Sequence, residues 1–343
     1  MANNVTVTNN FDGDFTIVIK HNTSNGYVLQ TPIVEDGVKW ETERQGSPGK
    51  LTFKVYTNRN NDLEFEEGDA VALSYRERGM DWQVLFSGYI FTKKRNKDGW
   101  VDVTAYDLLR YFKNKHTYVF KDVRASDVLK QIAEDYKLPI GTIEATNYVI
   151  GERVEDDQSL FDIVQNALDL TLVGTGTMYA VYSDSTGVCL RNVNNMKTDV
   201  IINESSAADF DYTSSIDDQT YNDIELYYDN DETNAREYYH AFSTDKMNVW
   251  GRLRLTESIK SPANAEDRAK KMLQLYNRET KKLKVKDAFG DYRCRAGASV
   301  IVQLNLGDTT VNNYMLIEKA THTFKKDEYR MELTLGGTTE FTA

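Results

Sequence analysis

Short runs of alternating polar and apolar residues recur along this chain and limit what it can fold into. Within the first hundred or so residues the alternating apolar positions are Phe15-Ile17-Ile19, Leu51-Phe53-Val55, Val71-Leu73 and Val101-Val103. Successive side chains of a strand point to opposite faces, so this period of two predicts strands with one buried face. Turn signals separate the runs at Asn25-Gly26, Pro48-Gly49, Gly68 and Asp98-Gly99, and the last of these predicts a hairpin.

The composition favours a mainly β protein. The 343 residues include 21 Tyr, 14 Phe and 4 Trp but only 4 Pro, and aromatic residues suit half-buried pleated surfaces. A mass of 39.3 kDa is enough for two or three domains. With 40% hydrophobic and 27% charged residues, the chain has the composition of neither a membrane protein nor a disordered tail.

The charge balance and the termini exclude several classes of protein. The formal net charge of -12 would repel a phosphate backbone, so we predict no direct sequence-specific contact with nucleic acid. Residues 1–16 lack the basic and apolar regions of a signal peptide. No run approaches the roughly 18 apolar residues of a membrane span, so none is expected. Cys189 and Cys294 have no metal-site or redox spacing and are predicted to be reduced and buried.

The pattern changes near residue 106, where two helices are predicted. One spans Ala125–Tyr136 and buries a face that comprises Val128, Leu129, Ile132, Ala133 and Tyr136. The other spans Ser159–Leu170, with Ser159 as its N-cap and a buried face that comprises Leu160, Phe161, Val164, Ala167 and Leu168. Strands are expected to resume at 178–182 and 188–193, with a turn at Gly187.

The second half predicts further strands and one helix. The polar stretch 203–218 is interpreted as a connection between domains. Strands are predicted at 224–228, 237–242, 251–255, 299–304 and 331–335. A third helix is predicted to begin at Ser261-Pro262, an N-cap followed by proline at the first helical position.

Two distant segments of the sequence are weakly alike. Residues 67–73 and 296–302 both combine a turn glycine, Gly68 or Gly297, with an alternating strand. Downstream, Lys93-Lys94 and residues 101–104 correspond to Lys325-Lys326 and residues 331–334. Hairpin chemistry alone produces some of this likeness, so coincidence is the alternative. If the repeat is real, the chain contains two related β domains with a helical module between them.

No constellation of residues predicts catalysis or metal binding. His21, His116, His240 and His322 lie in unrelated contexts, without an H-E-x-x-H or G-x-S-x-G run. Three segments are interpreted structurally: 155–157 as acidic residues before a helix N-terminus, 229–234 as an acidic turn, and 174–177 as a turn after a helix. We therefore predict no catalytic residue, no metal ligand, no cofactor-binding residue and no cofactor.

A glycosidase needs only two suitably placed carboxylates, so a peptidoglycan hydrolase or a cell-wall carbohydrate-binding module of a tail remains the alternative. A triad assembled from distant segments is also open, and a monomeric surface adhesin is a third possibility.

Several segments together resemble a known family. Residues 51–55, 67–71, 85–90 and 104–111 resemble the baseplate hub proteins of contractile phage tails. The nearest likeness is to hubs of defective prophages and phage-tail-like bacteriocins (tailocins) of Gram-positive bacteria. The predicted helix 125–136, residues 138–141, residues 159–163 and Ala296-Gly297 continue it.

The resemblance implies a fold and a function. The fold would be β-rich α+β, with two similar tail-tube-like β-barrel domains at 1–110 and 203–343 and a small inserted α+β module at 111–202. As an alternative, part of 203–230 would pack back on the first domain. The chain would be a non-enzymatic structural hub, a homotrimer that joins a sixfold tail tube to a threefold spike. Its partners would be the tail tube protein, the central spike protein, other baseplate proteins and, as a further candidate, the tape measure protein. It would lie in the baseplate of a particle assembled in the bacterial cytoplasm.

Overall fold

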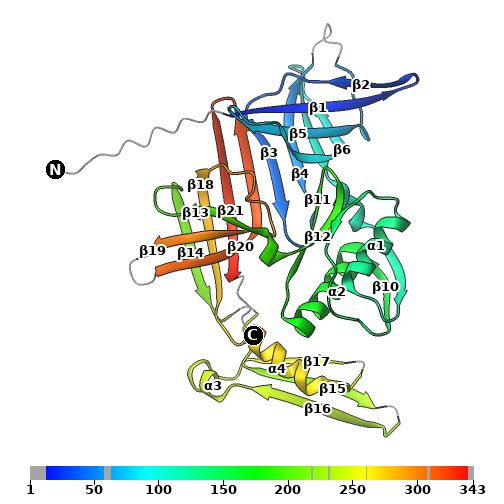
Figure 1. The fold of residues 1–343 in the computed structure, drawn as a ribbon, viewed down its shortest axis with the longest axis vertical. Coiled ribbons are helices and arrows are strands. Elements are labelled where there is room, and N and C mark those ends of the chain that lie inside the picture. The colour runs from blue at the N-terminus through cyan, green and yellow to red at the C-terminus, as the bar shows by residue number, and fades with distance from the viewer. Residues whose placement is uncertain are drawn as a thin grey trace, which may run out of the picture.

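The computed structural model describes residues 13–57, 63–217, 219–230, 232–259, 261–306 and 310–338, and the chain is β-rich with few helices (Figure 1). Its first seven strands are β1 (Gly13–Thr23), β2 (Gly26–Gln30), β3 (Val38–Glu43), β4 (Lys50–Tyr56), β5 (Ala70–Glu77), β6 (Gln83–Arg95) and β7 (Trp100–Tyr106). The alternating residues of the sequence, such as Ile17, Leu51 and Val71, are buried as predicted. The predicted turn at Asp98-Gly99 joins β6 to β7 in a hairpin.

A mixed segment follows in the chain. Its elements are the 3-10 helix η1 (Leu108–Lys113), β8 (Lys115–Phe120), α1 (Ala125–Asp135), β9 (Ile140–Ile143), β10 (Arg153–Ser159), α2 (Leu160–Thr175), β11 (Tyr179–Asp184), β12 (Gly187–Asn192), the 3-10 helix η2 (Val193–Met196) and β13 (Lys197–Ile202). Both predicted helices are present. α2 continues to Thr175, where Gly176 adopts a left-handed backbone with φ 72° and ends it.

The N-terminus of α2 is capped as the sequence predicts. The Ser159 hydroxyl accepts a hydrogen bond from the Asp162 backbone N–H at 3.2 Å and donates one to the Asp162 carboxylate at 2.6 Å. This satisfies one of the N–H groups that a helix N-terminus leaves without an intrahelical partner.

We expect Ser159→Ala to lower the free energy of unfolding by about 1 kcal/mol, because the first turn of α2 loses its cap. Urea denaturation followed by circular dichroism measures the change. Ser185→Ala is the matched control, since Ser185 is exposed in the turn between β11 and β12. Equal effects of the two substitutions would contradict a capping role for Ser159.

The second half of the chain differs from the prediction at several places. Its elements are β14 (Asp209–Ser215), β15 (Asp223–Asn230), β16 (Ala235–Phe242), α3 (Thr244–Trp250), β17 (Arg254–Ser258), α4 (Ala265–Tyr276), β18 (Thr280–Phe289), β19 (Ser299–Asn305), β20 (Thr310–Lys325) and β21 (Glu328–Thr338). Strand β14 lies in the stretch interpreted as a connection, and α3, β18 and β20 lie where no element was predicted. Strand β17 spans 254–258, where the prediction was 251–255. Helix α4 begins at Ala265 and not at Pro262, because Ala265 N–H bonds to Pro262 O at 3.1 Å in a preceding turn.

Most strands belong to one sheet that runs through both halves of the chain. Its path is β14-β18-β21-β20-β3-β4-β7-β6-β5-β1-β2, with β19 pairing to β20 and β13 to β19. The path is open at β14 and at β2, so the described strands close no barrel, and the predicted barrels are not seen. Antiparallel pairing of β20 with β3 connects the two halves.

Four hydrophobic clusters lie in the part of the chain that the structure describes. One lies in the first half, under β1 and β3–β7, and includes Phe324 and Tyr329 from the second half. Another lies under β18–β21. The third holds α1 and α2 and includes Leu129, Ile132 and Val164, with Phe161 half-buried at its margin. The fourth lies between α4 and the separate three-stranded sheet β16-β15-β17, at the lower end of the view in Figure 1.

Candidate functional site

The turns that contain Gly68 and Gly297 make the same hydrogen bonds. Gly68 has φ 94° and Gly297 has φ 89°, a region that favours glycine. Gly68 N–H donates to Ile90 O at 2.8 Å, and Gly297 N–H donates to Ile317 O at 2.8 Å. In return, Ile90 N–H bonds to Asp69 O at 2.9 Å and Ile317 N–H to Ala298 O at 2.8 Å. The two glycines therefore lie at corresponding turns, as the sequence repeat predicts.

The strands around these turns also correspond. β6 and β7 shift register between Ile90 and Thr92, and β20 and β21 shift between Ile317 and Lys319, so both hairpins carry a bulge at the same place. The strand order β3-β4-β7-β6-β5 repeats as β14-β18-β21-β20-β19. Val71 and Val300 are both buried on the strands that follow the turns. The likeness ends at the next strand, because β1 is antiparallel to β5 whereas β13 is parallel to β19.

The junction between the halves combines strand pairing with side-chain contacts. Residues 319–324 of β20 pair with residues 43–38 of β3. Beside them, Arg44 Nε contacts Glu318 Oε2 at 2.7 Å. Thr42 Oγ1 accepts a hydrogen bond from Ala296 N–H at 2.9 Å. The side chains of Trp40 and His322 stack with their centroids 4.9 Å apart. The junction thus has three contacts that depend on the register.

His322 is fully buried at this junction and has two hydrogen-bond partners. Its Nε2 lies 3.0 Å from Cys294 O, and its Nδ1 lies 2.9 Å from the Tyr329 hydroxyl. A carbonyl can only accept, so Nε2 carries the proton and Nδ1 accepts from tyrosine. Burial lowers the pKa of His322 to about 4, and the ring is neutral near pH 7. A neutral, enclosed ring is a packing element, and sequence patterns gave no signal for it.

A second buried polar group links three parts of the chain. Asp107 caps η1 by accepting from Leu109 N–H at 3.0 Å. Burial raises its pKa to about 7, while Arg295 and hydrogen bonds oppose that rise. Arg295 donates to Ser183 O at 3.0 Å and lies over the Tyr182 ring of β11. The contacts of Arg295 hold the Gly297 turn against β11. The carboxyl group of Asp107 is buried and therefore has no access to a substrate.

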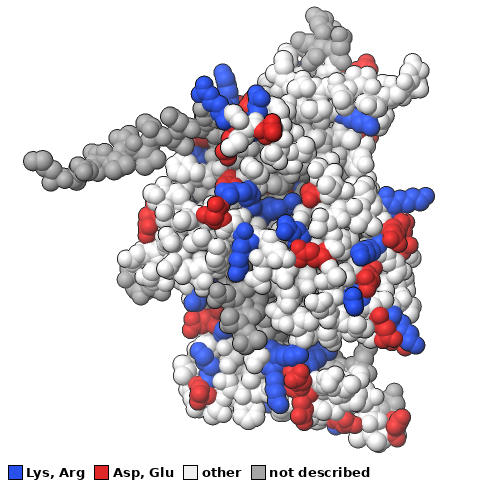
Figure 2. Space-filling view, in the orientation of Figure 1, with Lys and Arg blue, Asp and Glu red and all other residues white. Residues whose placement is uncertain are grey.

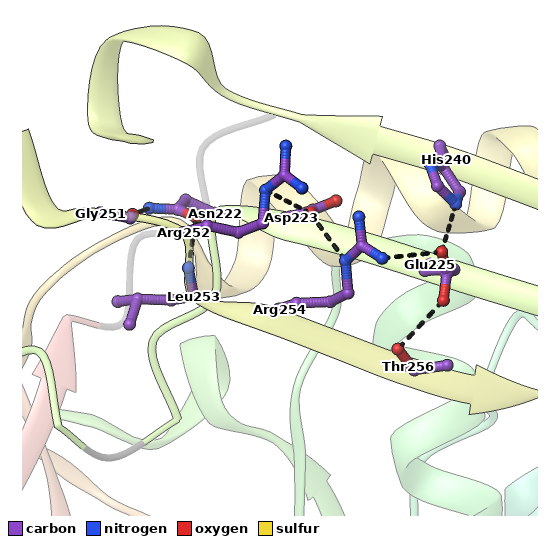
Figure 3. A network of polar contacts seen from close by, with 9 residues as sticks. All are labelled: Asn222, Asp223, Glu225, His240, Gly251, Arg252, Leu253, Arg254 and Thr256. Carbon is purple, nitrogen blue, oxygen red and sulfur yellow. Dashed lines mark hydrogen bonds and ion pairs between the residues drawn. The ribbon is translucent and has the colours of Figure 1, made fainter. Parts of the chain in front are cut away.

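A polar network holds β17 beside β15 in the small three-stranded sheet (Figure 3). Asp223 contacts Arg254 Nε at 2.8 Å and Arg252 Nε at 3.3 Å. Glu225 contacts Arg254 Nη1 at 3.0 Å and His240 Nε2 at 2.6 Å. Figure 3 shows these side chains directed toward one another. Each carboxylate is occupied by cationic or hydrogen-bonding partners, so the network fastens strands together and leaves no pair of acids facing open space.

Asn222 completes the same network at the start of β15. Its side chain donates to Gly251 O at 2.7 Å and accepts from Leu253 N–H at 2.9 Å. Both contacts fix the loop between α3 and β17 (Figure 3). His240 and Glu237 lie on strand β16, as the alternating interpretation of that segment predicts.

The acidic segments considered in the sequence have structural partners. On β10, Glu155 pairs with Arg153 at 2.5 Å, and Asp157 pairs with Lys115 of β8 at 3.1 Å. These contacts differ from the predicted interaction with the helix N-terminus, where Asp162 lies instead. The segment 229–234 joins β15 to β16, and 174–177 follows α2, as predicted. Among the described ranges no three His, Cys, Asp or Glu side chains gather as a metal site.

Other expected features are also visible in the described part of the chain. Cys189 and Cys294 are free and buried, which confirms that prediction. No helix there is long and apolar enough to cross a membrane. An open hollow of about 460 Å³ lies between the end of β16 and α4, lined by residues such as Phe242, Asp245 and Gln274. On the face shown in Figure 2, basic and acidic side chains are interspersed.

Comparisons with known proteins identify relatives over most of the chain. The protein YqbQ of Bacillus subtilis (strain 168) is 27% identical over 310 residues, which cover 88% of this chain and 91% of YqbQ. The phage-like element PBSX protein XkdQ of the same strain is 25% identical over 310 residues, which cover 88% of this chain and 92% of XkdQ. The 43 kDa tail protein of prophage MuSo2 from Shewanella oneidensis has a similar structure, with a TM-score of 0.65 at 10% identity, covering 93% of this chain and 98% of that one.

These findings confirm the resemblance to tail proteins of Gram-positive defective prophages. The family model for YqbQ-like proteins matches residues 38–336. That span takes in both corresponding turns and the junction between β20 and β3, and the chain therefore belongs to the YqbQ-like family.

Proposed function

We propose that this protein is a structural baseplate hub of a contractile phage tail or a phage-tail-like particle. In this role it forms a homotrimer that joins the sixfold tail tube to the threefold spike. The repeated strand order around Gly68 and Gly297 carries the proposal. A threefold assembly meets a sixfold one through like contacts only if each subunit offers two similar surfaces, and three chains with two such halves supply six.

The proposed division of the chain follows the repeat. One tail-tube-like half comprises about residues 1–110 and the other lies within 203–343, with 111–202 inserted between them. The three-stranded sheet β16-β15-β17 with α4 has its own hydrophobic cluster and forms an appendage of the second half. The tail tube protein and the central spike protein are the principal partners. Other baseplate proteins and the tape measure protein complete the set, in a particle assembled in the bacterial cytoplasm.

The proposed role is binding and not catalysis. One relative is a phage-like element protein by name, and a protein of similar fold is a prophage tail protein. Asp223 and Glu225, the acids of the network in Figure 3, both contact arginine. A peptidoglycan hydrolase would need one acid and one base directed at a substrate. Incubation with purified cell walls should therefore release no soluble sugar or peptide.

Solution mass and imaging test the trimer. Sedimentation equilibrium at rising concentration should reveal a species three times the 39.3 kDa of the chain. Negative-stain images should show rings with six similar lobes. Because neighbouring components can drive ring closure, the same images are taken of the assembled particle. A particle that contains one, two or six copies at the tube end would contradict the proposal.

A further inference from the structure

We propose that the open edge of β6 pairs with β14 of a second copy of this chain. The contact would repeat, between subunits, the junction that β20 and β3 make within one subunit. This inference rests on the trimeric hub proposed above and names the strands that would close its ring. In such a ring, each subunit pairs its β6 with β14 of one neighbouring copy and its β14 with β6 of the other.

Both strands have an edge without a partner strand in the described ranges. β6 pairs with β5 only up to Tyr89, so the segment Thr92–Arg95 has β7 on one side and no strand on the other. β14 pairs with β18 alone and ends the path of the sheet. β6 corresponds to β20 and β14 to β3 in the repeat. The two open edges are therefore the counterparts of the two strands that meet at the internal junction.

The internal junction fixes the register of the proposed pair. Thr92 corresponds to Lys319, because each follows the bulge and pairs with a threonine, Thr104 or Thr334. Tyr212 corresponds to Trp40, because their partners Leu283 and Leu51 occupy matching places beside β21 and β7. Transferring the pairs of β20 with β3 then gives three pairs across the subunit boundary: Lys93 with Ser214, Lys94 with Thr213 and Arg95 with Tyr212.

Side chains at the two open edges match those at the internal junction. Ser214 corresponds to Thr42, whose hydroxyl accepts from Ala296 N–H, and Glu67 N–H corresponds to that donor. Glu67 N–H has no hydrogen-bond acceptor in the ranges that the structure describes. Ser214 would therefore provide the acceptor that Thr42 provides internally.

The stacked pair and the ion pair of the junction also have counterparts. Arg95 and Tyr212 take the places of His322 and Trp40, and a guanidinium can lie over a tyrosine ring as the imidazole lies over tryptophan. Phe91 and Ile216, both half-buried, take the places of Glu318 and Arg44. One polar contact is thus exchanged for an apolar one, which adds burial on association.

Charge favours β14 over a second β6 as the partner. The β6 edge carries Lys93, Lys94 and Arg95, with Lys97 in the turn that follows. Two copies of this edge would repel each other. β14 itself carries Asp209 and Asp211 and no basic residue. Its neighbour β18 carries Lys281, Lys282, Lys284 and Lys286, and Lys286 contacts both aspartates at 3.0 and 2.9 Å. A pairing of β6 with β14 therefore places no basic side chain directly opposite Lys93, Lys94 or Arg95, whereas a pairing of two β6 edges would.

A disulfide between Lys94→Cys and Thr213→Cys tests the register. In the junction, Arg44 N–H bonds to Glu318 O at 2.9 Å. The alternation of an antiparallel pair then makes Thr321 with Glu41 a non-hydrogen-bonded pair, with Cα atoms about 4.5 Å apart. Lys94 with Thr213 corresponds to that pair, and this spacing permits a disulfide. Both side chains are exposed, and the native cysteines are buried.

We expect mild oxidation of this double variant to yield a covalent closed trimer that reducing agent dissolves. Lys94→Cys with Asp209→Cys is the matched control, because Asp209 lies four residues from Thr213, about 13 Å along the strand. The control should yield no covalent trimer. Equal cross-linking in both double variants would overturn the proposed register.

Other outcomes separate the edge pairing from the hub. A trimer by mass that never cross-links at this pair overturns the edge pairing and leaves the hub standing. Cross-linking at this pair into open ladders, without a closed trimer, supports the edge pairing and contradicts the trimeric hub. A chain that stays monomeric and uncross-linked at every concentration overturns the edge pairing, and the count of copies in the particle then decides the hub.

Charge reversal provides a second measurement. Lys94→Glu should lower the trimer fraction at 0.15 M salt, and the difference from the unmodified chain should shrink at 1 M salt, where charges are screened. Lys130→Glu, on the exposed face of α1, is the control of equal charge and should have no effect. An equal loss for both variants would point to net charge and overturn the proposed contact.

Discussion

Replacing Gly297 with alanine should lower the free energy of unfolding by about 2–5 kcal/mol, whereas Gly68→Ala should cost only about 1–2 kcal/mol. The two glycines share a positive φ, so both substitutions pay the same backbone strain. Their surroundings differ. A Cβ on Gly68 meets open space, but a Cβ on Gly297 would lie 2.6 Å from the Cβ of buried Ala180. Overpacking of this kind adds about 1–3 kcal/mol.

Chemical denaturation of the two variants measures the difference. Adding Ala180→Gly to Gly297→Ala should recover part of the loss, since the clash involves the Ala180 methyl group. The same Ala180→Gly change in the Gly68→Ala background should only destabilise. If both glycine variants lose the same stability, the close approach of β11 to the Gly297 turn is wrong.

The second large effect is an acid-induced loss of stability at His322. Its pKa is about 4 in the folded chain, against an ordinary value of 6.5. Between these values the unfolded chain binds the proton and the folded chain does not, so stability is full above pH 6.5 and falls as the pH drops toward 4. The difference corresponds to about 3 kcal/mol.

Comparison with His322→Gln isolates this effect. A glutamine amide can donate to Cys294 O in place of Nε2 but does not titrate. The variant should have a lower free energy of unfolding than the natural chain at pH 7. At pH 4.5 this difference in the free energy of unfolding should be smaller by about 2–3 kcal/mol. The comparison is needed because Asp107, with its raised pKa of about 7, gives the opposite trend: its folded form holds a proton that the unfolded chain has released. A difference in the free energy of unfolding that does not change with pH would contradict a buried neutral His322.

Local patterns predicted about half of the described strands and two of the helices, because period two and the Ser159 cap are signals within one segment. Local patterns failed where a segment of the sequence is compatible with two different structures. Phe210 and Tyr212 of β14 alternate like a strand, yet they are only half-buried and lie among Ser and Asp residues, a composition that is typical of a connection. Ser261-Pro262 fits a helix start, but the chain first makes a turn and Asn264 with φ 59° precedes α4.

The junction was beyond the reach of the sequence for a different reason. β3 and β20 are almost 280 residues apart, and antiparallel edges of similar composition can pair in many combinations. The buried role of His322 depends on hydrogen bonds with Cys294 and Tyr329, which lie outside its own strand. The two predicted barrels are not seen among the described strands, because local patterns do not specify which distant strands pair. The corresponding turns could be predicted, because Gly68 and Gly297 both have the positive φ that favours glycine.

The pairing of β3 with β20 has a consequence for how the chain folds during its synthesis. Synthesis releases β3 roughly 280 residues before its partner residues 319–324. Phe324 and Tyr329, which complete the first hydrophobic cluster, arrive with them. The nascent N-terminal half therefore has an uncovered strand and an unfinished core until β20 and β21 have been synthesised. Folding of the first half is in this way coupled to synthesis of the second half, and a chain that stops before β20 lacks the finished sheet from which a ring could be built.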